Sequence, residues 1–198
     1  SLEWSTKHQE LLLCGYTKPN DFSINQANGL ILLWSLAMRK APEFTLTCQT
    51  EITSAVFHRY NPKLVIGASF TGQILIWDTR GKSVPVLKTP PANKVHTHPI
   101  YCLGINGTTN SNNIVSVSND GLLCTWSVSN LSKYTKRIEL KKKKVKTEPT
   151  ITTSSQNQTT DEIGAICMAI PENDLNTVMI GSDDADIYQV SIHQKNEM

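Results

Sequence analysis

The sequence has little of what would place this chain in a membrane or along a nucleic acid. Its longest apolar runs, such as residues 30–34, are far shorter than a membrane-spanning helix requires. Lys and Arg together number 19 and Asp and Glu number 17, so the net charge is only +2, which argues against a chain-wide nucleic-acid surface. The chain starts without an initiator Met and without a basic or apolar leader. We therefore expect a piece of a longer protein, with no signal peptide.

Paired cysteines and the usual catalytic motifs are also lacking. The five cysteines are an odd number, none forms a CxxC pair, and each lies in an apolar run, so we expect buried free thiols. There is no glycine-rich phosphate loop, no cluster of metal ligands and no convincing pair of carboxylates. The sequence therefore predicts neither an enzyme nor a cofactor or metal. Asp183, Asp184 and Asp186 are expected to form a turn, and Ca²⁺ binding is the alternative.

The chain does contain an internal repeat. Residues 28–36, 71–79, 120–128 and 184–192 align, and each segment opens with a small or polar turn. The first three apolar runs end at Trp34, Trp77 and Trp126, and the fourth ends at Val190. Further short apolar runs precede and follow each segment, separated by Gly, Asn, Asp and Pro. Such runs are typical of antiparallel strands.

A four-stranded repeat of about 40 to 45 residues whose third strand ends in Trp is the signature of a β-propeller blade. We therefore predict an all-β fold, a WD-repeat propeller fragment of three full four-stranded blades plus a partial fourth. The blades are expected at roughly 1–49, 50–90, 95–141 and 163–192, with a disordered insertion at 142–162. Each blade must bury its apolar faces against its neighbours.

WD-type blades often hold a buried polar network, and the third repeat has the most complete set. The predicted members are His98, Ser116, Ser118, Asp120 and Trp126. A Ser–His–Asp catalytic triad is the alternative, but neither serine has the surrounding sequence of a nucleophile elbow. His96 and His98 form a His-x-His pair that could chelate a metal, although no third ligand is evident.

An incomplete propeller should expose a blade face at each end. Met168, Ile170 and Ile187 are the predicted residues of one such face. Exposed apolar faces favour association, so we expect the fragment to self-associate or to be marginally stable alone.

The insertion carries a lysine run, residues 141–146. This run could bind nucleic acid or an acidic surface, or act as a nuclear localisation signal. Few aromatic residues accompany it, so a solvated loop is the favoured interpretation and nucleic-acid binding is not.

Several stretches resemble the WD-repeat region of the dynein intermediate chain, closer to its cytoplasmic branch. They are residues 28–36, 41–50, 52–80, 85–90, 95–131 and 168–181. The resemblance implies a noncatalytic subunit of a cytoplasmic, microtubule-associated motor, with a propeller scaffold that binds the dynein heavy chain and helps to link the motor to cargo. Other dynein subunits would bind regions outside this chain, and no short motif marks the heavy-chain contacts. The alternative is a generic WD-repeat scaffold whose basic loop binds peptide or nucleic acid.

Overall fold

The computed structural model describes residues 1–17, 27–38, 40–91, 96–141, 163–171 and 173–192. The predicted insertion at 142–162 therefore lies outside the described residues. The described residues form four antiparallel sheets, and within each sheet the strands follow one another in chain order. The first sheet holds β1 (Leu2–Trp4), β2 (Leu11–Thr17), β3 (Gly29–Ser35) and β4 (Phe44–Cys48), and the second holds β5 (Ile52–Phe57), β6 (Leu64–Ser69), β7 (Ile74–Asp78) and β8 (Leu87–Lys88).

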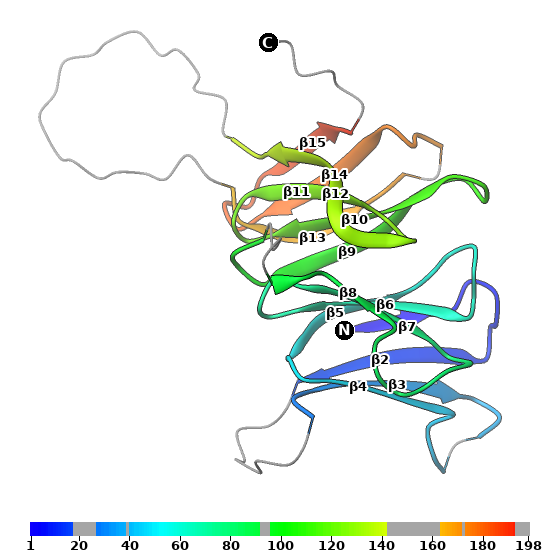
Figure 1. The fold of residues 1–198 in the computed structure, drawn as a ribbon. Coiled ribbons are helices and arrows are strands. Elements are labelled where there is room, and N and C mark those ends of the chain that lie inside the picture. The colour runs from blue at the N-terminus through cyan, green and yellow to red at the C-terminus, as the bar shows by residue number, and fades with distance from the viewer. Residues whose placement is uncertain (18–26, 39, 92–95, 142–162, 172, 193–198) are drawn as a thin grey trace, which may run out of the picture.

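The third sheet holds β9 (Ile100–Gly107), β10 (Asn112–Ser118), β11 (Leu122–Ser127) and β12 (Asn130–Glu139). The fourth holds β13 (Ala165–Ala169), β14 (Thr177–Ser182) and β15 (Ile187–Ser191). Figure 1 shows the four sheets stacked in chain order, as propeller blades are. The predicted all-β class, with three four-stranded blades and a partial fourth, is confirmed. The described part of the chain contains no helix that is long and apolar enough to span a membrane.

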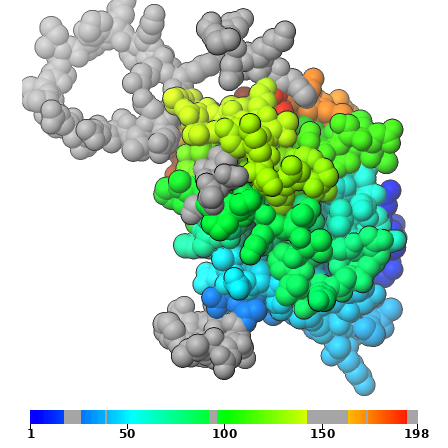
Figure 2. Space-filling view, viewed as in Figure 1, coloured from blue at the N-terminus to red at the C-terminus, as the bar shows by residue number. Residues whose placement is uncertain are grey.

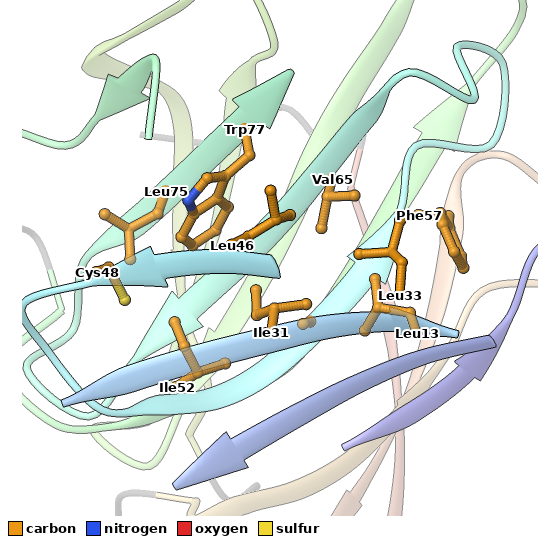
Figure 3. Packing of buried hydrophobic residues seen from close by; sticks show 11 residues of the cluster. Leu13, Ile31, Leu33, Leu46, Cys48, Ile52, Phe57, Val65, Leu75 and Trp77 are labelled. Atoms are coloured by element: carbon orange, nitrogen blue, oxygen red, sulfur yellow. The ribbon is translucent and has the colours of Figure 1, made fainter. Parts of the chain in front are cut away.

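Three apolar clusters hold the stack together, one between each pair of neighbouring blades. The third strands of the second and third blades supply side chains to the clusters on both sides, because alternate residues of a strand point to opposite faces. In β7, Leu75 and Trp77 pack against the first blade, whereas Ile74 and Ile76 pack against the third. Figure 3 shows Trp77 and Leu75 beside Leu46 and Cys48 of the first blade. The tryptophan of a covered blade thus packs on the preceding blade.

The turn before the third strand repeats in its backbone as well as its sequence. Gly72 and Gly121 have φ values of 79° and 70°, in the left-handed region that glycine tolerates. In the fourth blade Ala185 occupies the same place, with φ of 66°. A residue with a Cβ is strained there, so the fourth repeat keeps the turn at a cost in stability.

The open face of the fourth blade differs from the sequence prediction. Ile187 is 79% exposed, as expected. Met168 and Ile170, however, are partly buried against the core shared with the third blade, so their assignment to the open face was wrong. The cause is an irregularity between Ala165 and Cys167, where the pairing of β13 with β14 shifts. The extra residue there reverses which side chains of β13 point outward.

Candidate functional site

A buried polar network lies in the third blade, and the imidazole ring of His96 is its central member. The side chain of His96 is fully buried, and its Nε2 lies 2.8 Å from the Oγ of Ser116. The indole Nε1–H of Trp126 donates to the same hydroxyl at 2.9 Å. On the other side of the ring, Nδ1 lies 3.4 Å from an oxygen of Asp120. The network therefore joins β10, β11, the turn between them and the segment that precedes β9.

The carboxylate of Asp120 fixes the direction of these hydrogen bonds. Burial alone would raise the pKa of Asp120, but hydrogen bonds from His96 and from the backbone N–H of Thr97 outweigh it and hold the pKa below its ordinary value. The N–H groups of Thr97 and Leu122 donate to this carboxylate at 2.9 and 3.1 Å. We assign the Nδ1–H tautomer to His96, so that Ser116 donates to Nε2 and accepts from the indole of Trp126.

The sequence assigned this histidine position to His98, and that assignment was wrong. The side chain of His98 is exposed, and its Nδ1 lies 2.9 Å from the hydroxyl of Thr97. The physical reason is the anchoring of Thr97: its N–H is held by Asp120, which turns the preceding residue inward. Ser118 also differs from the expectation, because its hydroxyl donates to the backbone carbonyls of His98 and Pro99 rather than to the ring.

This arrangement suits support of the sheet rather than catalysis. Ser116 and His96 are fully buried, so no substrate can reach the hydroxyl that a triad would need as its nucleophile. Within the described ranges, no three His, Cys, Asp or Glu side chains are grouped so that they could hold a metal ion.

The three blade tryptophans occupy different surroundings. Trp126 and Trp77 are almost completely buried, and the indole N–H of Trp77 donates to the backbone oxygen of Thr47 in the first blade at 3.3 Å. Gly67 lies where Ser116 lies in the third blade, and a Cβ added to it would stand 2.8 Å from the indole of Trp77. Trp34 is only partly buried. It lies on the face of the first blade that no described sheet covers.

Searches against known proteins support the resemblance seen in the sequence. No family model matches the chain. Over 195 residues, 98% of its length, the chain is 35% identical to the cytoplasmic dynein 1 intermediate chain of Drosophila melanogaster. The chain is homologous to part of a dynein intermediate chain. It spans 27% of the length of that relative.

The sequence did not predict the polar contacts between the second and third blades. The ring of His58 accepts hydrogen bonds at Nδ1 from the N–H groups of Tyr60 and Asn61, at 3.2 and 2.9 Å. Its Nε2 lies 3.0 Å from the amide oxygen of Asn112 in the third blade. Tyr60 donates to the carbonyl of Gly107 at 2.5 Å. We call these contacts the interblade clasp. Its two bonds between the blades join residues 54 and 47 positions apart, so no local pattern could reveal them.

A second contact that the sequence did not predict ties the first strands of the first two blades. The carboxylate of Glu3 in β1 accepts a hydrogen bond from the N–H of Phe57 in β5 at 2.6 Å. Burial raises the pKa of Glu3, although this hydrogen bond opposes the rise. The sequence signal that could have revealed this contact is the position of Glu3 between the apolar residues Leu2 and Trp4.

Proposed function

We propose that this chain is part of a noncatalytic intermediate-chain subunit of the dynein motor complex, in the cytoplasm and associated with microtubules. In this proposal its blades are a scaffold that binds the dynein heavy chain and helps to link the motor to cargo. The supporting observation is the 35% identity to a dynein intermediate chain over 98% of this chain, across all four blades.

The physical character of the fold supports a scaffold. Three apolar clusters and the interblade clasp hold the blades in fixed relative positions. The polar network that resembles a triad is buried and holds strands together. A rigid stack of sheets leaves outer strands and turns on its surface, and Figure 2 shows the residues of β12, in yellow-green, on the surface of this view. Binding needs only such a surface.

Retention of the heavy-chain tail by the immobilised chain tests the proposal. We expect the tail to be retained, and to be lost when an exposed cluster on one blade surface is changed to residues of opposite charge. Each variant must keep the melting temperature of the unchanged chain, so that a lost partner is not confused with unfolding. Failure to retain the tail at every salt concentration tested would contradict heavy-chain binding.

The lysine run at 141–146 allows a separate test of the alternative hypothesis, a generic WD-repeat scaffold whose basic loop binds peptide or nucleic acid. Lys141 pairs with Glu139 at 2.9 Å, and the rest of the run lies outside the described residues. The scaffold proposal predicts that replacing residues 141–146 by serine leaves heavy-chain retention unchanged. An RNA interaction that depends steeply on salt and disappears with this replacement would favour the generic WD-repeat scaffold instead.

A further inference from the structure

The outer edges of the first two blades enclose a groove with a volume of about 470 Å³. One wall is formed by the end of β4 and the turn after it, residues 47–50, and the other by residues 84–88, which lead into and include β8. We call this space the outer groove. It lies between two blades that are both complete, and so it is independent of the open faces at the ends of the stack.

Backbone hydrogen bonds fix both walls of the outer groove. The N–H of Thr47 donates across the groove to the carbonyl of Ser83 at 2.7 Å, and the oxygen of Thr47 accepts from the indole of Trp77. Val86 is tied to β7 by a bond from its N–H to the carbonyl of Ile76 at 2.8 Å. A ligand therefore meets a preformed site, which lowers the entropy lost on binding.

The floor and one wall are apolar. Cys48 and Leu75, whose side chains lie beside each other in Figure 3, line the groove and are nearly buried, whereas Val84 and Val86 on the wall are 51% and 62% exposed. Burial raises the pKa of Cys48, so its thiol is uncharged at neutral pH. An apolar side chain placed in the groove would cover both valines without burying a charge.

A single cation stands beside this apolar surface. Lys88 lines the groove, its side chain is exposed, and the described residues give it no ion pair. The other lining residues that the structure describes are uncharged. Val84, Val86 and Lys88 all line this wall, so along the chain two apolar side chains are followed by a positive one at the same groove.

We propose that the outer groove docks an extended peptide segment of a partner protein, in which an aliphatic side chain lies two positions from a carboxylate. Side chains at positions i and i+2 of an extended peptide point the same way, about 6.5–7 Å apart. That spacing matches Val86 and Lys88, which stand two positions apart where the chain is hydrogen-bonded to β7 and which both line the groove. The aliphatic side chain would lie over Val84 and Val86, and the carboxylate would pair with the ammonium group of Lys88. This proposal does not depend on the dynein assignment.

Fluorescence anisotropy with three labelled peptides tests the proposal on the whole chain. The first peptide is Gly-Ser-Leu-Ser-Glu-Ser-Gly, the second carries Lys in place of Glu, and the third carries Ser in place of Leu. We expect the first peptide to bind at least about threefold more tightly than either of the others, as an exposed ion pair or one buried aliphatic group allows.

Charge reversal in the protein provides the matched comparison. Lys88→Glu should reverse the preference between the Glu and Lys peptides, while Lys133→Glu, an exposed lysine of the third blade with the same change of charge, should leave it as it was. Val86→Ser should weaken the binding of both the Glu peptide and the Lys peptide. Lys88 and Val86 are exposed, so these variants are expected to keep the melting temperature of the unchanged chain. Absence of binding by the Glu peptide, equal binding of the Leu and Ser peptides, or equal effects of Lys88→Glu and Lys133→Glu would each overturn the proposal.

Discussion

The second and third blades carry the same tryptophan-ended strand but satisfy its indole N–H in different ways. In the third blade, the N–H of Trp126 is bound by Ser116 within the same sheet. In the second, Gly67 stands in place of that serine, the indole of Trp77 lies against it, and the N–H reaches Thr47 of the preceding blade. The tryptophan thus determines which face packs on the preceding blade, and the residue ten positions before it determines where the N–H is bound.

The first and fourth blades extend this comparison, because each lacks a neighbour on one side among the described residues. Trp34 repeats the motif but is only partly buried. Ile187 repeats the position of Ile31 and Ile74, which pack on the following blade, yet Ile187 is 79% exposed. Burial of a blade residue is therefore set by the neighbouring blade as much as by its own sequence.

Replacing the tryptophan of a covered blade and that of an uncovered blade should give the largest difference in stability, and it separates the contribution of the neighbouring blade from that of the blade's own sequence. Trp77→Ala removes a fully buried ring and leaves a large cavity, so we expect it to lower the free energy of unfolding by about 3–5 kcal/mol. Trp34→Ala should cost less than about 1–2 kcal/mol in the monomer, since its ring is already partly exposed. Urea unfolding at low protein concentration measures both, and equal losses would contradict the assignment of faces.

The polar network of the third blade predicts a smaller but specific loss. Ser116→Ala leaves the indole N–H of Trp126 and the Nε2 of His96 without their shared partner, which should cost about 1–3 kcal/mol. Ser127→Ala is the matched control, because that hydroxyl contacts Ser129 at the surface, and it should change stability by less than about 0.5 kcal/mol. Urea unfolding again provides the measurement. Indistinguishable midpoints for the two variants would argue against a structural role for the network.

The interblade clasp between the second and third blades should respond to acid. Burial lowers the pKa of His58 below its ordinary value of 6.5, because removal from water disfavours the charged ring, although the hydrogen bond to the side chain of Asn112 opposes the shift. The contribution of His58 to stability is therefore complete above pH 6.5 and is lost as the pH falls through the lowered pKa of the folded state. Melting temperatures between pH 7.5 and 5 should fall less for His58→Gln than for the unchanged chain. Parallel curves would show that the clasp does not titrate.

The turn of the fourth blade should give the smallest effect, and it is a gain. Ala185→Gly relieves the positive φ of 66° that Gly72 and Gly121 accommodate in the second and third blades. We expect a stabilisation of about 0.5–1 kcal/mol, since the relief of strain is partly offset by the greater freedom of glycine in the unfolded chain. Gly121→Ala should destabilise by a similar amount. Thermal unfolding measures the pair, and a loss of stability for Ala185→Gly would show that this turn is not strained.

The order of strands and blades could be predicted because it depends on local patterns. Alternation of apolar residues, the turn before each third strand and the terminal tryptophans all act within one repeat. The positions of His96, Met168 and Ile170 could not be predicted in this way. His96 is turned inward because the N–H of its neighbour Thr97 is bound by the carboxylate of Asp120, 23 residues further along the chain. Met168 is turned inward by an irregularity in the pairing of β13 with β14, which the sequence does not mark.

The stacking of blades on one another is tested most directly by the mass of the chain in solution. Sedimentation velocity over a range of concentrations should give a mass above the 22.0 kDa of a single chain, rising with concentration, because the apolar faces at Trp34 and Ile187 match the two sides of every covered interface. Trp34→Ser and Ile187→Ser should lower that mass, whereas Val86→Ser, which changes an exposed residue outside these faces, should not. A single compact species of 22.0 kDa at every concentration, with a high melting temperature, would contradict the account.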